Sequence, residues 1–135
     1  MKNSITIYTD GGSRGNPGPA GIGYVIKDSD GNNLELGSKF IGTKTNNEAE
    51  YLALISALEQ AKKITSEQVN IIADSELMIK QLRKEYKVKQ NHLKILLEQV
   101  ETLSQNFSKI TYSHVKRELN KEADLLVNQA LNNHK

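Results

Sequence analysis

The segment SITIYTD (residues 4–10) decides the fold, because its apolar and polar residues alternate. Ile5 and Ile7 fall on one face of the segment and its polar residues on the other, with the two-residue period of a β-strand. Two further β-type segments follow at residues 21–27 and 33–41, joined by the turn-forming sequence DSDGN. Three strands with short links predict an antiparallel meander at the start of the sheet.

The remainder of the chain alternates helical and β-type patterns. Apolar residues at helical spacing predict helices at residues 47–63, 75–86, 91–104 and 120–132. Apolar runs at residues 69–74 and 109–116 predict two more strands. The order βββαβααβα therefore predicts an α/β protein of one domain (residues 1–135). Its five-stranded mixed sheet would hold three antiparallel strands and then βαβ crossovers, flanked by helices.

The composition fits one domain and excludes several classes of protein. With 135 residues, 37% of them hydrophobic, the chain can bury the core of a single domain. The absence of cysteine excludes disulfides and cysteine-based zinc sites. No apolar run approaches the roughly 20 residues that span a bilayer, and the polar start MKNSITIYTD is unlike a secretory signal, so we expect a cytoplasmic protein. The net charge of +2 is too small to indicate a nucleic-acid-binding protein by itself.

Four acidic residues stand at positions where a carboxylate is either costly or useful. Asp10 ends the first predicted strand before two glycines, and Asp74 closes the fourth. Glu50 lies near the apolar stripe of the first predicted helix, and Asp124 lies on a polar stripe of the last helix with Asn120 and Asn128. Ordinary interpretations remain open for three of them: a turn residue for Asp10, a helix cap for Asp74 and a solvated helix face for Asp124.

A cluster of these carboxylates would need positive charge. Carboxylates that gather near a core repel one another and raise each other's pKa unless a cation lies between them. Because the chain lacks cysteine, the oxygen ligands would select magnesium or manganese. If the four acids converge, the leading hypothesis is therefore a hydrolytic site with two such ions. Spacing alone leaves their convergence open.

The motifs that carry these acids resemble those of type I ribonuclease H. In family order they are IYTDGGSRGNPGP (residues 7–19), TNNEAE (45–50), ADS (73–75) and NKEAD (120–124). The resemblance covers essentially the whole chain, and the ribonuclease H-like fold has the same order of elements. The chain is most similar to the short-loop branch of the family, and a separate hybrid-binding domain is not expected.

The resemblance implies an endoribonuclease that hydrolyses the RNA strand of RNA/DNA hybrids, leaving 3′-hydroxyl and 5′-phosphate ends. It assigns catalysis and metal binding to Asp10, Glu50, Asp74 and Asp124. In TNNEAE the matching glutamate is Glu50 rather than Glu48. The cofactors implied are two Mg²⁺ ions, with Mn²⁺ as a substitute.

The resemblance also implies how the substrate is held. The side chains expected to contact the hybrid are those of Asn16, Thr45, Asn46 and Asn47. The 2′-hydroxyls that distinguish RNA from DNA are expected to meet the main chain of Gly11, Gly12 and Ser13. The hybrid is the only partner we expect, with no membrane and no obligate protein partner, and the chain is expected to be a monomer.

The chain departs from the longer members of the family before its last acid. Those members carry a histidine on a flexible loop before the last aspartate, and that loop is missing here. Arg117 takes the place of the loop, so we expect a catalytic role for Arg117, with a surface arginine as the alternative. His114 lies within the predicted fifth strand, which disfavours it as the replacement for the loop histidine.

A second departure is a shortened connection between the predicted helices at residues 75–86 and 91–104. Residues 80–94 hold six basic residues and one acid, Glu85. Such a concentration suits contact with phosphates, so Lys84, Lys87 and Lys89 are predicted to line the DNA backbone of the hybrid. A solvated helix end is the alternative interpretation.

Three other functions compete with this one. A catalytically silent nucleic-acid-binding module on the same fold is disfavoured, because pure binding gains nothing from four acids facing phosphates. Another metal nuclease of the superfamily, such as a resolvase or integrase core, is disfavoured by the TNN and DGG motifs. The nuclease domain of a reverse transcriptase is disfavoured because we expect the chain to hold this domain alone.

Overall fold

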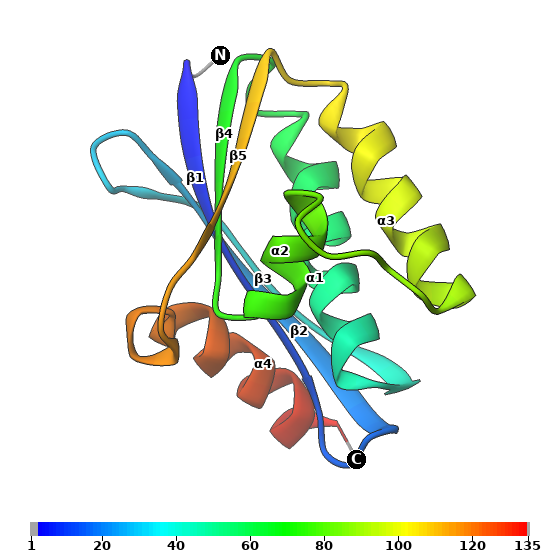
Figure 1. The fold of residues 1–135 in the computed structure, drawn as a ribbon. Coiled ribbons are helices and arrows are strands. Elements are labelled where there is room, and N and C mark those ends of the chain that lie inside the picture. Colours follow the sequence, from blue (N-terminus) through cyan, green and yellow to red (C-terminus); the bar gives the residue numbers. More distant parts are fainter. Residues whose placement is uncertain (1–2, 135) are drawn as a thin grey trace.

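The computed structural model describes residues 3–134, which form one mixed sheet with helices on both faces (Figure 1). The strands are β1 (Ser4–Ser13), β2 (Gly18–Asp28), β3 (Asn33–Lys44), β4 (Gln68–Ala73) and β5 (Lys109–His114). The α-helices are α1 (Asn46–Ala61), α2 (Glu76–Leu82), α3 (Asn91–Ser104) and α4 (Lys121–Asn133), with a short 3₁₀ turn η1 (Arg117–Leu119) before the last. The predicted order of elements is confirmed.

The sheet has β1 at its centre. Its strand order is β3-β2-β1-β4-β5. β1 pairs antiparallel with β2, and β2 with β3, whereas β1 pairs parallel with β4, and β4 with β5. The predicted mixed sheet is therefore confirmed, and the carboxyl ends of three parallel strands meet at one edge, where open α/β sheets place their sites.

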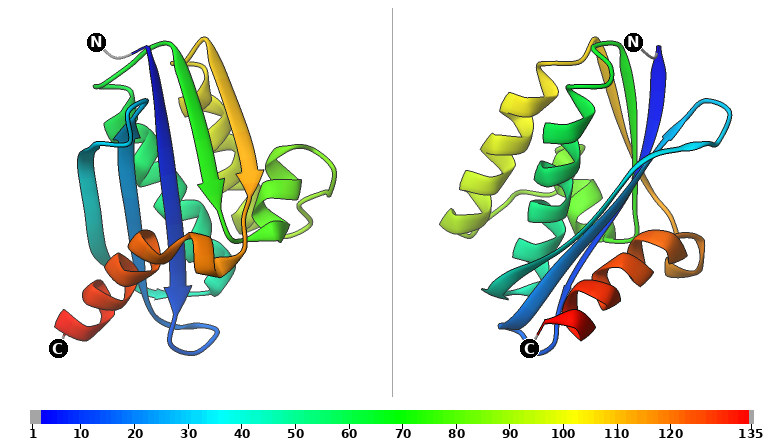
Figure 2. Two further views of the ribbon diagram at one scale, coloured as in Figure 1. Left: turned by 90° about the vertical axis from the view of Figure 1, so that its left-hand side faces the viewer. Right: turned by 180° about the vertical axis from the view of Figure 1, so that it is seen from behind.

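The two faces of the sheet are covered unequally. Helices α1, α2 and α3 lie on one face and α4 crosses the other (Figure 2). The main core lies under α1, which buries apolar residues on several sides, and it includes Ile7 of β1, Leu54 of α1 and Ile71 of β4. α3 adds Val100, whose side chain is fully buried. This core fixes α1 against β1, and the two elements carry two of the four acids.

Several predicted boundaries were wrong. The helix expected to reach residue 86 ends at Leu82, because Lys84 adopts a left-handed conformation (φ 64°) that no helix continues through. The fifth strand ends at His114, two residues early, where the chain turns into η1. The first strand, by contrast, runs on to Ser13, because its glycines stay paired with β2 as far as Ala20.

No helix within residues 3–134 has the combination of length and apolar composition that a membrane crossing requires.

Candidate active site

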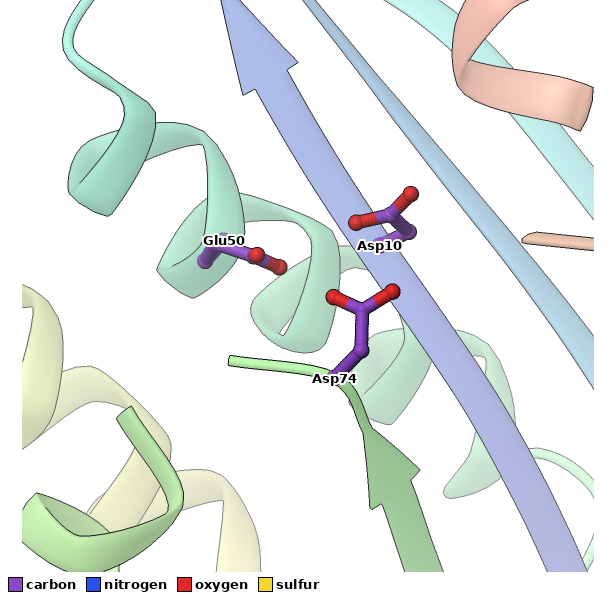
Figure 3. A group of neighbouring side chains, drawn as sticks. All are labelled: Asp10, Glu50 and Asp74. Carbon is purple, nitrogen blue, oxygen red and sulfur yellow. The ribbon is translucent and has the colours of Figure 1, made fainter. Parts of the chain in front are cut away.

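Asp10 lies within β1, beside the point where β4 ends and Asp74 follows it. β1 and β4 run parallel with Thr9 opposite Ala73. Asp10 and Asp74 directly follow these two residues, so they lie side by side (Figure 3). β1 continues past the end of β4, paired with β2 alone among the described strands. The sheet therefore opens next to Asp10, and the two carboxylates point into the opening.

Glu50 reaches the same place because α1 lies very close to β1. A Cβ atom at Gly11 would lie 2.2 Å from the carbonyl oxygen of Ala49, so only glycine permits this approach. The Gly11 N–H donates to Asp10 Oδ1 at 3.0 Å and to Glu50 Oε1 at 3.1 Å. One backbone amide thus holds the carboxylates of a strand and a helix together.

The start of α1 is fixed by a capping box. The Glu48 N–H donates to Thr45 Oγ1 at 3.1 Å, and the Thr45 N–H donates to Glu48 Oε1 at 2.9 Å. Glu48 is therefore occupied at the helix end, while Glu50 lies among the acids of the site, which agrees with the assignment of Glu50 from the TNNEAE motif.

Asp124 enters from the opposite face of the sheet on α4. A Cβ atom at Gly23 would lie 2.4 Å from the carbonyl oxygen of Ala123, so this glycine lets α4 press against β2. The Asp124 carboxyl lines the same cavity as Asp10, and its charge helps to raise the pKa of Asp10. Gly23 therefore lets the helix that carries Asp124 approach the sheet, as Gly11 lets the helix that carries Glu50 approach it.

The four acids share one cavity of about 330 Å³. Within it, carboxylate oxygens of Asp10, Glu50 and Asp74 all lie within 4.8 Å of one another, a separation at which one cation can contact all three (Figure 3). Asp124 lines the same cavity but stands outside this compact set. The structure therefore brings together all four predicted acids, three of them tightly.

The electrostatics of the cluster are strained without a cation. Burial, followed by the charges of Asp74 and Asp124, raises the pKa of Asp10 from 3.8 to about 8. Burial, followed by Asp10 and Asp74, raises the pKa of Glu50 well above its usual value. Burial also raises the pKa of Asp74, against a hydrogen bond from Asn120 that lowers it. At neutral pH the cluster therefore retains protons unless positive charge replaces them.

Arg117 and His114 occupy different surroundings. Arg117, in η1, lines the cavity, and its Nη2 lies 3.2 Å from Asp124 Oδ1. Its side chain is 75% exposed, so this ion pair holds it loosely. His114, at the end of β5, lies with Nδ1 4.0 Å from Glu76 Oε2, and it is not among the residues that line the cavity. The geometry thus favours Arg117, whose catalytic role stays a prediction.

Three of the residues expected to contact the substrate, Ser13, Asn16 and Asn46, form a hydrogen-bonded network. Asn46 Oδ1 accepts from the Ser13 N–H at 2.8 Å and from Ser13 Oγ at 3.1 Å. The Asn46 N–H in turn donates to Asn16 Oδ1 at 3.0 Å. Gly11, Gly12, Ser13 and Asn46 line the cavity. Thr45 and Asn16 are not among the lining residues, and the Thr45 hydroxyl accepts from the Glu48 N–H in the helix cap.

The basic segment lies apart from this cavity. Lys87 and Lys89 line a separate groove of about 610 Å³, which also includes Asn47 at the start of α1. Lys84 does not line that groove, and its Nζ lies 2.8 Å from Glu101 Oε2 on α3. Asn46 and Asn47 are adjacent, so the start of α1 separates the acidic cavity from the basic groove.

Three residues at the site had no role predicted from the sequence. Arg14 and Asn128 line the cavity, and Asn128 Nδ2 donates to the Asp124 carbonyl at 3.1 Å. Asn120 lies buried beside the cluster and hydrogen-bonds Asp74. The four-residue spacing of Asn120, Asp124 and Asn128 marks one polar stripe on α4. That spacing is the signal in the sequence that could have identified this wall of the site.

Comparison with known proteins agrees with this geometry. A family model described as reverse transcriptase-like matches residues 8–130. Ribonuclease HI of Halobacterium salinarum is 40% identical over 127 residues, which cover 94% of this chain and 64% of that protein. The chain belongs to the type I ribonuclease H family. The bifunctional protein Rv2228c of Mycobacterium tuberculosis is 41% identical over 128 residues, but the chain spans only 35% of its length.

Solved ribonuclease H structures superpose over nearly the whole chain. RNase H1 of Halobacterium salinarum has a TM-score of 0.94 at 38% identity, covering 97% of this chain and 99% of that one. LC11-RNase H1, isolated from compost and solved in complex with an RNA/DNA hybrid, has a TM-score of 0.91 at 44% identity, covering 95% and 96% of the two chains. The fold of this ribonuclease H family member is therefore shared along nearly its full described length.

Proposed function

We propose that this chain is an endoribonuclease that hydrolyses the RNA strand of RNA/DNA hybrids, leaving 3′-hydroxyl and 5′-phosphate ends, with two divalent metal ions. The observation that carries the proposal is the convergence of Asp10, Glu50 and Asp74, with oxygens within 4.8 Å of one another, in one cavity with Asp124. The complex of the similar LC11-RNase H1 with a hybrid supports this substrate.

The residues present fit magnesium or manganese. The donors are carboxylate oxygens, and the chain has no cysteine that would favour a softer metal. The pKa values of Asp10 and Glu50 are raised because no positive charge neutralises the buried carboxylates, and divalent ions would supply that charge. When bound, two such ions would lower the pKa of the attacking water and stabilise the leaving 3′-oxygen.

The chain's own residues hold the acids in position. The Gly11 N–H orients both Asp10 and Glu50, so the strand and the helix present their carboxylates at a fixed separation. Because the cavity excludes much of the solvent around Asp10, charge there acts through a low effective dielectric constant. Electrostatic stabilisation of a transition state needs such fixed charges in a site from which most water is excluded.

Arg117 is placed to bind a phosphate of the substrate when Asp124 binds a metal ion instead of the guanidinium. Its guanidinium pairs with Asp124 from an exposed position, so it can move to a phosphate oxygen at little cost. An arginine is suited to this exchange, because its planar fork binds carboxylates and phosphates in the same geometry. We assign Arg117 to stabilising charge on the scissile phosphate.

The end of β1 and the turn that follows it supply the discrimination between RNA and DNA. Asn46 and Asn16 brace this turn, so the main chain of Gly11, Gly12 and Ser13 is rigid where it borders the cavity. A fixed row of backbone amides and carbonyls beside the acids can pair with 2′-hydroxyls, which DNA lacks.

The basic groove supplies the contact with the DNA strand. Lys87 and Lys89 line it together with Asn47, and the start of α1 joins it to the acidic cavity. A hybrid duplex bound across α1 would place its RNA strand at the acidic cavity and its DNA strand at the groove. Lys84 contributes less, because it lies outside this groove.

One assay separates this function from its competitors. A labelled RNA/DNA hybrid, an RNA duplex and a DNA duplex are each incubated with magnesium, manganese or a chelator. Cleavage of the RNA strand of the hybrid, with either metal and not with chelator, is expected. Cleavage of the DNA duplex would indicate a resolvase-like or integrase-like nuclease instead, and binding of the hybrid without cleavage would indicate a silent binding module.

A further inference from the structure

Asn120 stands at the start of α4 with its side chain turned away from the helix. It occupies the N-cap position, yet its side chain makes no capping hydrogen bond within residues 3–134. The residue is 1% exposed. An asparagine at this position ordinarily stabilises a helix by accepting from its first free N–H groups. Here that contribution is given up, so another contact must account for the orientation of the side chain.

The side-chain amide points at the acidic cluster. Asn120 Nδ2 donates to the carbonyl oxygen of Thr9 at 2.8 Å and to Asp74 Oδ2 at 3.4 Å. Thr9 directly precedes Asp10, so one amide group connects the backbone beside one acid to the carboxylate of another. The orientation of the amide is fixed, because a flipped amide would set its oxygen against a carbonyl and a carboxylate.

The main chain of Asn120 connects a third acid. The Asp124 N–H donates to the Asn120 carbonyl at 3.1 Å, which forms the first turn of α4. Asn120 therefore contacts β1 beside Asp10, the end of β4 at Asp74, and the helical turn that carries Asp124. These segments are two strands of the sheet and a helix on one of its faces, and they lie far apart in the sequence.

The arrangement has a cost that the fold alone does not explain. Asn120 Oδ1 is buried and has no hydrogen-bond partner among the described residues. A buried acceptor without a partner destabilises the folded state. The residue thus forgoes a helix cap and leaves an acceptor unpaired, while its side-chain amide donates to the backbone beside Asp10 and to the Asp74 carboxylate.

We propose that Asn120 is a positioning residue for the metal site, which fixes the separation of Asp10, Asp74 and Asp124 before any ion binds. This proposal rests on the proposed function, in which the four acids hold divalent ions. Asn120 itself contacts neither the ions nor the substrate. Residues that orient metal ligands through hydrogen bonds typically change metal affinity or activity by about 10- to 100-fold when they are removed.

The test measures metal binding directly. Mn²⁺ alone is titrated calorimetrically into the full chain and into three variants, Asn120→Ala, Asn120→Ser and Val100→Ala. Val100 is a fully buried residue of α3, so Val100→Ala controls for lost stability without touching the site. We expect about 10- to 100-fold weaker binding for Asn120→Ala and wild-type binding for Val100→Ala. A serine hydroxyl can donate only one hydrogen bond, so Asn120→Ser should fall between them.

A kinetic measurement separates positioning from substrate contact. With hybrid as substrate, Asn120→Ala should need more Mg²⁺ to reach half-maximal rate, while KM for the hybrid at saturating Mg²⁺ is unchanged. If Asn120→Ala does not fold, Asn120→Ser carries both measurements. Metal affinity of a folded Asn120 variant equal to that of Val100→Ala would overturn the proposal. If the unmodified chain itself binds no Mn²⁺, the metal function fails, which is a distinct result.

Discussion

The acidic cavity and the part of the basic segment that connects α2 and α3 (residues 83–90) are built in opposite ways. In the cavity, Asp10 is 7% exposed, and hydrogen bonds from Gly11 and Asn120 fix the acids from several elements. The basic segment is irregular, and its ion pairs lie in solvent, as the Lys84–Glu101 pair does. Bond breaking needs fixed geometry, whereas holding a polyanion needs charge that can adapt.

This difference predicts different kinetic losses in the two regions. A change in the cavity should lower turnover, because it removes interactions made with the transition state. A change in the basic segment should raise KM and alter its salt dependence, because it removes binding shared by the ground and transition states.

The largest effect is expected at Asp10. Asp10→Asn removes a ligand from the compact set and should lower cleavage of the hybrid by at least about 1,000-fold, the scale of losing a metal contribution. Binding of the hybrid should persist or improve, because a charge that repels phosphate is lost. Asp30→Asn, in the exposed turn after β2, is the matched control and should leave turnover unchanged. Substantial magnesium-dependent cleavage by Asp10→Asn would refute the site.

An intermediate effect is expected at Arg117. Arg117→Ala should lower turnover by about 10- to 1,000-fold, the range for one lost electrostatic contribution. His114→Ala should be nearly silent, because that side chain lies beside Glu76 rather than in the cavity. Turnover of the two variants on one hybrid is the measurement. A larger loss in His114→Ala would reverse the assignment.

The smallest effect is expected in the basic segment, and it should fall on KM. Changing Lys84, Lys87 and Lys89 together to glutamine should raise KM severalfold and flatten its dependence on salt, with turnover little changed. Because Lys84 lies outside the groove that Lys87 and Lys89 line, the double variant of Lys87 and Lys89 should account for most of the change.

Changing Lys62 and Lys63 to glutamine controls for net charge, since both are exposed at the far end of α1. A double variant of Lys87 and Lys89 with the same KM and salt slope as this control would show that the basic segment is ordinary surface.

The sequence predicted the elements well where the local pattern was strong. The helix α3 has the predicted bounds, because its apolar residues recur at helical spacing between polar flanks. The spacing of Thr45 and Glu48 in TNNE is that of a capping box, and the structure contains one there. The end of α2 was missed, because a lysine rather than a glycine takes the left-handed position at residue 84.

The site was predictable only in part. The resemblance identified the four acids, but the close approaches that unite them depend on the missing side chains of Gly11 and Gly23. A glycine in a strand can equally mark a bulge or a bend, so its presence alone does not predict a close approach. Asn120 could not be separated from an ordinary helix cap, because its role depends on which way its side chain turns. Convergence of distant residues is a property of packing, and no local pattern encodes it.

The central claim is that Asp10 lies in a buried acidic cluster that needs a divalent cation, and thermal unfolding tests it most directly. The pKa of Asp10 is raised from 3.8 to about 8, so between these values the unfolded chain gives up a proton that the folded chain keeps. The stability of the metal-free protein should therefore fall as pH rises from about 4 to about 8. Mg²⁺ binds the deprotonated carboxylates of the folded state, so the rise in Tm that it produces should be larger near pH 8 than near pH 5. Asp10→Asn should weaken both dependences, and a Tm that Mg²⁺ leaves unchanged at both pH values would contradict the account.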